Sequence, residues 1–157
     1  MNRLSFDENG NLTPYELIEL DLESINSEFV ARFPNSVSRL IILNAFRDYV
    51  AELRVALDSP FDVWINGSFT TEKLNPNDID FVVFVDTVVV GTHLTEIRQF
   101  RERRFGGTSV TDGYFDEVYP VEHPNHRIGL LNRRDRECLF GYDKQGNRKG
   151  IVRLLIS

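Results

Sequence analysis

Two aspartates stand two positions apart at the start of an apolar run, in Asp78-Ile79-Asp80-Phe81. Side chains at i and i+2 of a β-strand project to the same face, so this spacing predicts two neighbouring carboxylates. Such a pair repels itself unless a cation bridges it or water solvates it, because an unpaired buried charge is very costly. Ligand sets made only of oxygen suit Mg²⁺, which commonly completes its coordination with substrate phosphates. The pair therefore predicts a site for a metal and a nucleotide.

Gly67-Ser68 precedes these aspartates by about ten residues and supplies groups that suit a phosphate. A glycine lacks Cβ and lets a phosphate approach the main chain, while the serine hydroxyl and the amides of residues 68–71 can donate hydrogen bonds. A phosphate site at Gly67-Ser68 would then lie opposite a metal site at Asp78 and Asp80. The alternative interpretation is an ordinary glycine turn followed by a turn-capping Asp78 and a solvated Asp80.

The elements that must position these groups follow from hydrophobic patterning. Residues 61–66 predict a short strand ending at Gly67-Ser68, and residues 78–85 predict a central strand covered on both faces. Asp21 is expected to cap a helix over 22–31, and a longer helix is expected over 36–57. Its predicted core positions are Leu40, Leu43, Phe46, Tyr49 or Val50, Leu53 and Leu57.

The remaining segments complete the expected organisation. They are an irregular lead-in over 1–14, a surface helix over 92–105 stopped by Gly106-Gly107, a third strand over 109–119, and a last strand or packed tail over 150–156. This order predicts an α/β or α+β fold, with a mixed central β-sheet flanked by helices. A length of 157 residues supports one core and one domain, over 1–157. Within it we expect an N-terminal appendage (1–35), a catalytic core (36–120) and a C-terminal extension (121–157).

The central motif resembles the DNA polymerase beta nucleotidyltransferase superfamily, which includes the minimal nucleotidyltransferases. More closely, residues 66–73 (Asn-Gly-Ser-Phe-Thr-Thr-Glu-Lys) followed by residues 75–80 (Asn-Pro-Asn-Asp-Ile-Asp) resemble a group of small bacterial nucleotidyltransferase-like proteins. That group's Phe-Asp-x-x-Gly-x-Leu and Lys-Gly-Ile-Val segments match Phe6–Leu12 and Lys149–Val152. The resemblance implies a nucleotidyltransferase fold, dependence on Mg²⁺ or Mn²⁺, and transfer of a nucleoside monophosphate from an NTP to an acceptor hydroxyl.

The resemblance also implies a third carboxylate, which shares the metal and serves as base for the attacking hydroxyl. Asp112 is the first candidate, since it heads the predicted third strand, and Asp116, on the same face four positions later, is the second. The predicted site is therefore Asp78, Asp80 and Asp112 as catalytic and metal-binding residues, with Gly67, Ser68 and Lys73 binding the nucleotide.

One departure concerns the triphosphate. Many minimal nucleotidyltransferases have Gly-Ser-x-x-Arg-Gly, whereas this chain has Thr71-Glu72 in place of Arg-Gly. The missing cation could be replaced by Lys73, by Lys149, or by an arginine of the predicted surface helix. Those arginines are Arg98, Arg101, Arg103 and Arg104.

Other reactive residue types favour plainer interpretations. His123 and His126 are expected in a loop, because Pro124 disfavours the helical spacing of a metal site. Cys138 is expected to be a small core residue, and Trp64 is expected to pack against the sheet. The arginines over 133–136 are expected on a solvated surface rather than on RNA.

Composition limits the function classes. The net charge is −6, with the acidic excess in residues 1–95 and a basic balance in 96–157, compatible with a cation site and with a phosphate-bearing ligand respectively. A single cysteine excludes an internal disulfide, and no secretory leader or membrane-spanning run is present, so we expect a cytoplasmic protein.

The sequence thus predicts a metal-dependent nucleotidyltransferase that acts on a hydroxyl of a protein, a tRNA or a small molecule. By analogy with the minimal nucleotidyltransferases, a toxin–antitoxin or defence system is one setting, and a homodimer or a toxin or antitoxin partner is compatible with the small size. The alternative is a non-catalytic module of the same fold, or an antitoxin-type partner protein, that binds without turnover.

Overall fold

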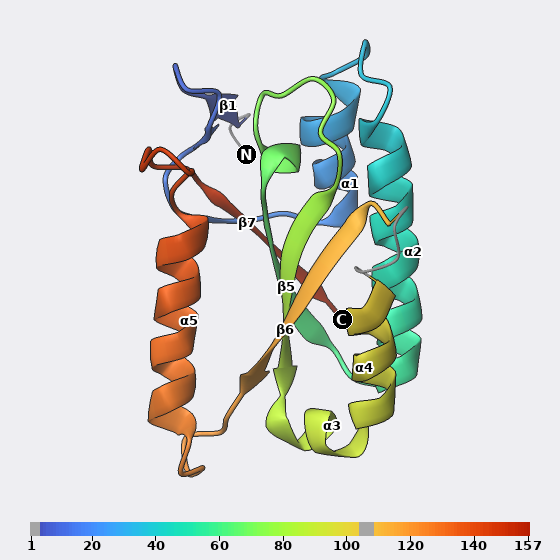
Figure 1. Cartoon of the computed structure of the whole chain (residues 1–157), viewed down its shortest axis with the longest axis vertical. Helices are drawn as coiled ribbons and strands as arrows, with labels where there is room; N and C mark the ends of the chain where they lie inside the picture. Colours follow the sequence, from blue (N-terminus) through green and yellow to red (C-terminus); the bar gives the residue numbers. More distant parts are fainter. Residues whose placement is uncertain (1–3, 104–108) are drawn as a thin grey trace.

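The computed structural model describes residues 4–103 and 109–157. A mixed five-stranded sheet with the strand order β3-β7-β4-β5-β6 forms its centre (Figure 1). Parallel pairs form at its two ends, β3 with β7 and β5 with β6, whereas β4 is antiparallel to both β7 and β5. The strands are β3 (Leu17–Glu19), β7 (Ile151–Ile156), β4 (Phe61–Asn66), β5 (Ile79–Asp86) and β6 (Thr111–Val118). The fold is α+β, and the expected mixed sheet flanked by helices is confirmed.

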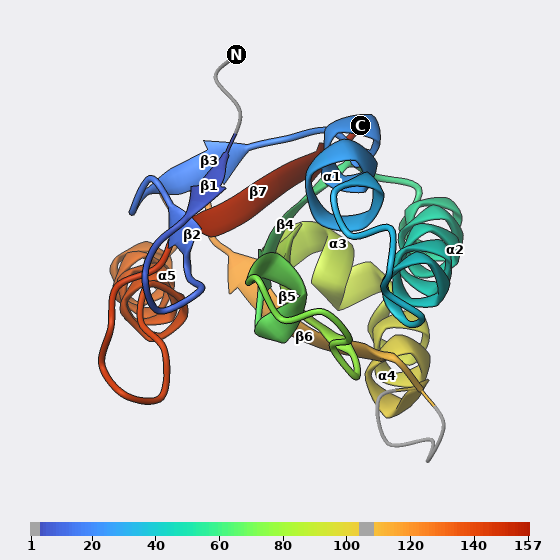
Figure 2. The same cartoon turned by 90° about the horizontal axis from the view of Figure 1, so that it is seen from above.

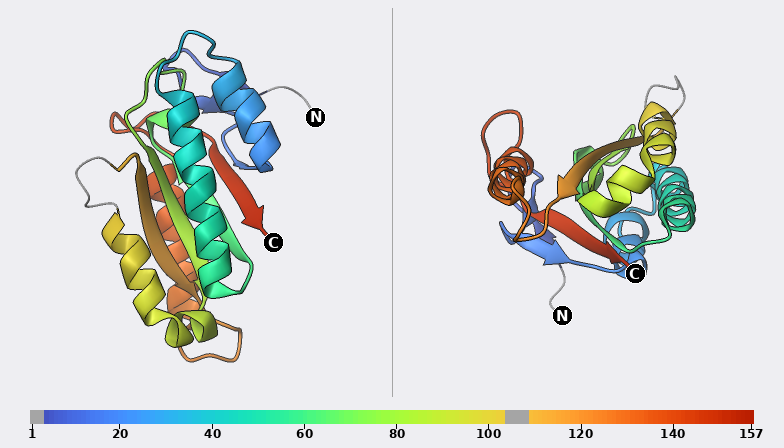
Figure 3. Two further views of the ribbon diagram at one scale, coloured as in Figure 1. Left: turned by 90° about the vertical axis from the view of Figure 1, so that its right-hand side faces the viewer. Right: turned by 90° about the horizontal axis from the view of Figure 1, so that it is seen from below.

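Helices cover both faces of this sheet. In the view from above, α1, α2 and α4 lie on one side and α5 on the other (Figure 2). Figure 3 shows α2 and α4 in front of the strands with α5 behind them, while α3 lies at the lower end of β5 in Figure 1. The helices are α1 (Leu22–Asn26), α2 (Arg39–Leu57), α3 (Thr87–Thr92), α4 (Leu94–Glu102) and α5 (His126–Phe140).

The alternation of side chains along the strands divides the core in two. On β5, Phe81 and Val83 pack in the larger cluster under α1, α2 and α4, whereas Val82 and Phe84 pack with Trp64 and Phe140 on the side of α5. β5 is therefore apolar on both faces, as predicted. Asp80 precedes Val82 by two residues and so belongs to the α5 side.

The predicted buried stripe of α2 is correct except at its beginning. Leu43, Phe46, Leu53 and Leu57 are buried, but Leu40 is 55% exposed. In that turn the inward position belongs to Arg39, which is fully buried three residues before Ile42 and four before Leu43. The core side of this turn is thus occupied by a charged side chain.

Several element boundaries agree with the prediction. Asp21 caps α1 by accepting from the Ser24 amide at 2.7 Å. The helix then passes into a π-helical segment, η1 (Ser27–Ala31), so its end agrees with the expected 22–31. The strands expected at 61–66 and at the end of the chain are confirmed as β4 and β7.

Other expectations were wrong or incomplete. The lead-in is not irregular, because β1 (Ser5–Phe6) and β2 (Leu12–Thr13) form a hairpin. α3 and α5 were not predicted, and Cys138, expected in the core, is exposed on α5. Gly106-Gly107, the expected helix stop, lies outside the described residues. Among the described residues, no helix combines the length and apolarity that crossing a bilayer requires.

Candidate metal centre

Three carboxylates converge at one end of the sheet. Asp78 immediately precedes β5, Asp80 is the second residue of β5, and Asp112 is the second residue of β6. The parallel register pairs Asp80 directly with Asp112. One oxygen from each of the three carboxylates lies within 4.8 Å of the others. The structure therefore brings together the three residues that the sequence analysis selected as metal ligands.

The second candidate for the third carboxylate lies elsewhere. Asp116 is on the same face of β6, but it pairs with Phe84, four residues further along β5. Its carboxylate accepts two hydrogen bonds from the Arg136 guanidinium, at 2.9 and 3.0 Å. Asp116 thus links β6 to α5 through its ion pair with Arg136. The geometry favours Asp112 as the third member of the cluster.

The carboxylates of the cluster disfavour one another's ionisation. Burial, the charge of Asp78 and a hydrogen bond with Asp112 together raise the pKa of Asp80 to about 7. Burial also raises the pKa of Asp78, with the charge of Asp112 as the second cause. Both carboxyl groups therefore hold their protons to a higher pH than an ordinary aspartate does. A bound divalent cation would favour their ionised forms instead. The donor set, three carboxylates and no nitrogen or sulfur, suits Mg²⁺ or Mn²⁺.

Gly67 is required by the carboxylate opposite it. Asn66 pairs with Asp80 across β4 and β5, and the next residue, Gly67, has φ 78°. A Cβ at position 67 would collide with Asp80 Oδ2 and lie 3.0 Å from Asp80 Cγ. The sequence analysis assigned this free space to a phosphate, whereas in the structure the Asp80 carboxylate uses it. The neighbouring Asn66 has a buried Oδ1 atom with no hydrogen-bond partner.

The turn after Gly67 is closed by its own hydrogen bonds. Ser68 begins a single turn of 3₁₀ helix, η2 (Ser68–Thr70), and its carbonyl accepts from the Thr71 amide at 3.2 Å and the Thr71 hydroxyl at 2.7 Å. Of the amides predicted to serve a phosphate, that of Thr71 is therefore used within the turn. Glu72 is also anchored, since its amide donates to the Gly10 carbonyl at 2.9 Å.

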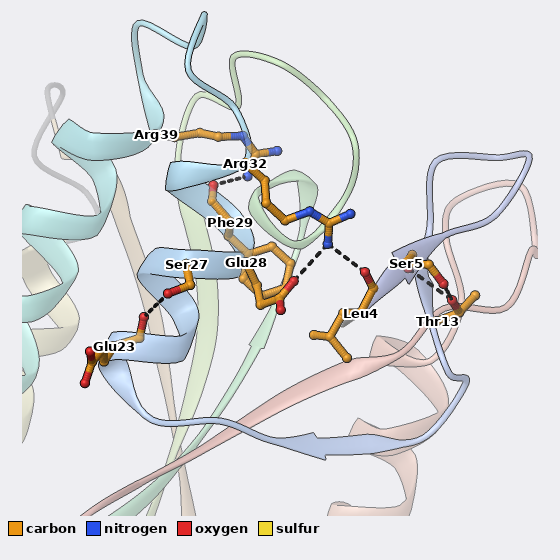
Figure 4. A network of polar contacts seen from close by, with 9 residues as sticks. All are labelled: Leu4, Ser5, Thr13, Glu23, Ser27, Glu28, Phe29, Arg32 and Arg39. Atoms are coloured by element: carbon orange, nitrogen blue, oxygen red, sulfur yellow. Dashed lines mark hydrogen bonds and ion pairs between the residues drawn. The ribbon is translucent and has the colours of Figure 1, made fainter. Parts of the chain in front are cut away.

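Arg39 holds this loop to α2, a role that the sequence analysis missed. Its guanidinium donates to the carbonyls of Phe29, Phe69, Thr71 and Lys73 at 2.5–2.8 Å. Figure 4 shows the side chain reaching the Phe29 carbonyl from the start of α2. The guanidinium also stacks 3.8 Å from the Phe33 ring centroid, and burial lowers its pKa to about 10. The one sequence signal was an arginine at helical spacing from Ile42 and Leu43.

Two lysines act on the carboxylates electrostatically. The charge of Lys73, which is exposed, opposes the rise in the Asp78 pKa. Lys149 is only 7% exposed, and its charge opposes the rise in the Asp80 pKa. Burial in turn lowers the pKa of Lys149. Both lysines named in the sequence analysis therefore lie near the carboxylates.

The candidate arginines of α4 are engaged differently. Arg103 pairs with Glu52 at 2.5 Å and lies over the Phe100 ring, and Arg101 lies over the Phe115 ring. Arg98 is exposed on α4, and Arg104 is outside the described residues.

The two terminal segments that resembled the bacterial group meet beside the site. The Gly150 amide donates to the Leu12 carbonyl at 2.7 Å, and a Cβ at position 150 would collide with the Pro14 carbonyl. The Asn11 side chain donates to Asp143 at 2.9 Å. Both hairpins have the sequence Asp-x-x-Gly-Asn, at 7–11 and 143–147, with the aspartate accepting the amides two and four residues later. These contacts fix the segment that carries Lys149.

The other residues behave mostly as expected. Trp64 is buried against Phe84, with ring centroids 4.7 Å apart. His123 lies before α5, as expected, and packs on the Tyr119 ring, whereas the expectation of a loop was wrong for His126, which is the first residue of α5. The arginines over 133–136 are not all solvated, because Arg133 pairs with Asp62 and Arg136 with Asp116.

Comparison of the chain with curated proteins and with solved structures finds no match. A model described as "Family of unknown function (DUF6932)" matches residues 4–155, nearly the whole chain. The β1–β2 hairpin, the acidic cluster and all but the last residue of β7 lie within that match. The chain therefore belongs to the DUF6932 family, whose function is unknown.

Proposed function

We propose that this protein is a metal-dependent nucleotidyltransferase that transfers a nucleoside monophosphate from an NTP to an acceptor hydroxyl. The observation that carries the proposal is the convergence of Asp78, Asp80 and Asp112, from two neighbouring strands, with ligand oxygens within 4.8 Å of one another. The mixed sheet and the Gly67-Ser68 turn beside these carboxylates are compatible with a nucleotidyltransferase fold.

The carboxylates would hold Mg²⁺ or Mn²⁺, which would supply charge neutralisation and Lewis acidity at the phosphates. Asp112, on the strand at the edge of the sheet, accepts the proton of the acceptor hydroxyl. The Gly67-Ser68 turn orients the β- and γ-phosphates. The acceptor oxygen forms its bond to the α-phosphorus as the bond from that phosphorus to the bridging oxygen breaks, and pyrophosphate leaves in line.

The acceptor is a hydroxyl of a protein, a tRNA or a small molecule, and a toxin–antitoxin or defence pairing in the cytoplasm is the setting that fits the resemblance. One observation favours a second candidate, a binding module without turnover. Thr71-Glu72 occupies the place where the minimal enzymes carry Arg-Gly, and Glu72 is exposed there.

Transfer of label from α-³²P NTPs to a component of cell extract, with Mg²⁺ or Mn²⁺, tests the proposal. We expect the wild type to label an acceptor and Asp78→Asn, Asp80→Asn and Asp112→Asn each to reduce labelling at least about 100-fold. Asp48→Asn, on the exposed side of α2, is the matched control and should retain labelling. Mn²⁺ and NTP binding without labelling would support the binding module instead. Labelling at the wild-type level by all three aspartate variants would contradict the proposed roles of the cluster in metal binding and in catalysis.

A further inference from the structure

Lys149 lies on the same side of the sheet as the acidic cluster. β7 runs antiparallel beside β4, with Val152 paired to Ile65, so the residues before Val152 pass along the end of β4. Ile151 packs in the cluster on the α5 side, whereas Val152 and Leu154 pack on the other side. Lys149 precedes Ile151 by two residues and lines a cavity together with residues of α5. Its side chain therefore shares the face of Asp80.

Lys149 lies within electrostatic reach of the acidic cluster. Adjacent strands lie about 4.8 Å apart, so β7 and β5, on either side of β4, are separated by roughly 10 Å. Lys149 stands two residues beyond Ile151, the position level with Asp80, and its long side chain covers part of the separation. Lys149 is 93% shielded from solvent, and the negative charges of Asp143 and, to a smaller extent, Asp80 act on it.

The other acid near Lys149 is already engaged. The Asp143 carboxylate accepts hydrogen bonds from the Asn11 side chain, from the Gln145 amide, and from both the amide and the side chain of Asn147. These bonds lie within the turn over 143–147 or join it to the turn over 7–11. Asp143 and Asp80 together provide the negative charge that a buried ammonium requires.

A cavity of about 460 Å³ lies on the far side of Lys149 from the acidic cluster. Its walls come from β7, from α5 and from the segment leading into β3, and none of them comes from β4, β5 or β6. The charged side chains that line it are Lys149, Arg134, Arg148, Glu16 and Glu137. Across the sheet the order is thus Asp112 on β6, Asp80 on β5, the Gly67 turn after β4, Lys149 before β7, and then the cavity.

The geometry of in-line displacement predicts on which side of the site the leaving group departs. The attacking oxygen and the departing pyrophosphate must lie on opposite sides of the α-phosphorus. If Asp112 receives the proton of the acceptor at the β6 edge, the pyrophosphate departs toward β4 and β7. A cation there stabilises the charge that develops on the leaving group.

We propose that Lys149 binds the β- and γ-phosphates of the donor and the pyrophosphate that leaves, with the cavity behind it as the exit. This inference rests on the proposed transferase. The acceptor oxygen replaces the bridging oxygen at the α-phosphorus, and the negative charge of the released pyrophosphate is countered by the Lys149 ammonium. Lys149 would then supply the cation that Thr71-Glu72 does not.

Calorimetric titration with Mg²⁺-pyrophosphate tests this role. We expect Lys149→Met to weaken pyrophosphate binding at least about 10-fold and Lys149→Arg to recover most of it, because arginine retains the charge. Lys144→Met, an exposed lysine of the same hairpin, is the control and should bind as the wild type does. Mn²⁺ binding in the absence of phosphate should be unchanged in Lys149→Met, and thermal melting verifies that each variant is folded.

The outcomes separate the two proposals. Unchanged pyrophosphate binding in Lys149→Met, a larger loss in Lys73→Met, or a wild type that does not bind pyrophosphate overturns the assignment to Lys149. If the wild type labels an acceptor and Lys149→Met labels it equally well, this inference fails while the transferase stands. A wild type that neither binds Mn²⁺ nor labels any acceptor overturns the transferase itself.

Discussion

Gly67 and the Asp80 carboxylate compete for one small volume at the end of β4. Gly67→Ala would place a methyl group on Asp80 Oδ2 and would also hold alanine at φ 78°. Gly146 offers a control for the positive φ, since it has φ 84° with no neighbouring atom within 4 Å, whereas Gly67 also has ψ −166°, a conformation nearly exclusive to glycine. We expect Gly146→Ala to cost about 1–2 kcal/mol, the price of the left-handed conformation alone.

Gly67→Ala should cost at least about 2 kcal/mol more than Gly146→Ala in urea unfolding, and it should abolish Mn²⁺ binding by displacing Asp80. Adding Asp80→Ala to Gly67→Ala removes the collision and should recover the extra loss of stability. Equal costs at the two glycines would show that Asp80 does not constrain position 67.

The raised pKa of Asp80 makes stability depend on pH in a defined direction. The folded state holds the Asp80 proton up to about pH 7, whereas the unfolded chain releases it near the ordinary value of 3.8. Stability from this group is therefore complete below about pH 4 and is lost as the pH rises through 7. We expect Asp80→Asn to raise the thermal midpoint by roughly 2–6 °C at pH 8, with the gain vanishing near pH 4.

Differential scanning calorimetry of the wild type and Asp80→Asn at pH 4 and pH 8 measures this effect. Saturating Mn²⁺ at pH 8 should raise the midpoint of the wild type but not that of Asp80→Asn. A gain of the same size at both pH values would mean that the ionisation of buried Asp80 is not its cause.

Among the elements, the loop over 69–73 is linked to α2 by Arg39. Arg39→Met removes the donor for four carbonyls, of which those of Phe29 and Phe69 are buried, so we expect a loss of roughly 3–5 kcal/mol in the free energy of unfolding. Arg39→Lys retains the charge but loses the planar guanidinium, so its loss of stability should be smaller than that of Arg39→Met but still measurable. Arg47→Met, half-buried about two turns further along α2, is the control.

Hydrogen exchange locates the effect of Arg39. In Arg39→Lys, the Thr71 amide, which donates to Ser68, should exchange faster, while the amides of β5 should stay protected. Uniform acceleration across the sheet would indicate a loss of global stability instead of release of the loop.

The elements also show what sequence patterning can and cannot supply. Asp78 and Asp80 were found because a strand fixes the direction of residues two apart, which is a local property. Asp112 and Asp116 share a face, and only the long-range register of β5 with β6 separates them. Arg39 occupies an inward position whose partners are backbone carbonyls, and these have no sequence signature.

The missed helix α5 has a different explanation. Its contacts with the sheet include the ion pairs of Arg133 and Arg136 and the packing of Phe140. Ile128, Leu131 and Leu139 are more than half exposed. The apolar periodicity that predicts a helix is therefore weak over this segment.

For the whole molecule, β7 is the strand that joins the two ends of the chain. It pairs with β3 on one side and with β4 on the other, and Arg153 bonds to Glu19 and to Asp62. Leu154 is 2% exposed and Leu155 62% exposed on this strand. We expect Leu154→Asp to cost at least about 4 kcal/mol and to unfold the sheet, because it buries an unpaired charge.

Leu155→Asp is the matched control, since the same substitution one residue later meets solvent, and it should cost less than about 1 kcal/mol. Circular dichroism melts of the two variants compare them. Equal destabilisation would contradict the placement of β7 within the core.

The position of β7 also determines the order of assembly during translation. A ribosome releases β3, β4 and β5 well before residues 151–156, so one side of β4 has no neighbour while more than half of the chain is still being made. That open strand edge can pair with other nascent chains until the last segment inserts. Protection by a chaperone should therefore matter for this protein until residues 151–156 have left the ribosome.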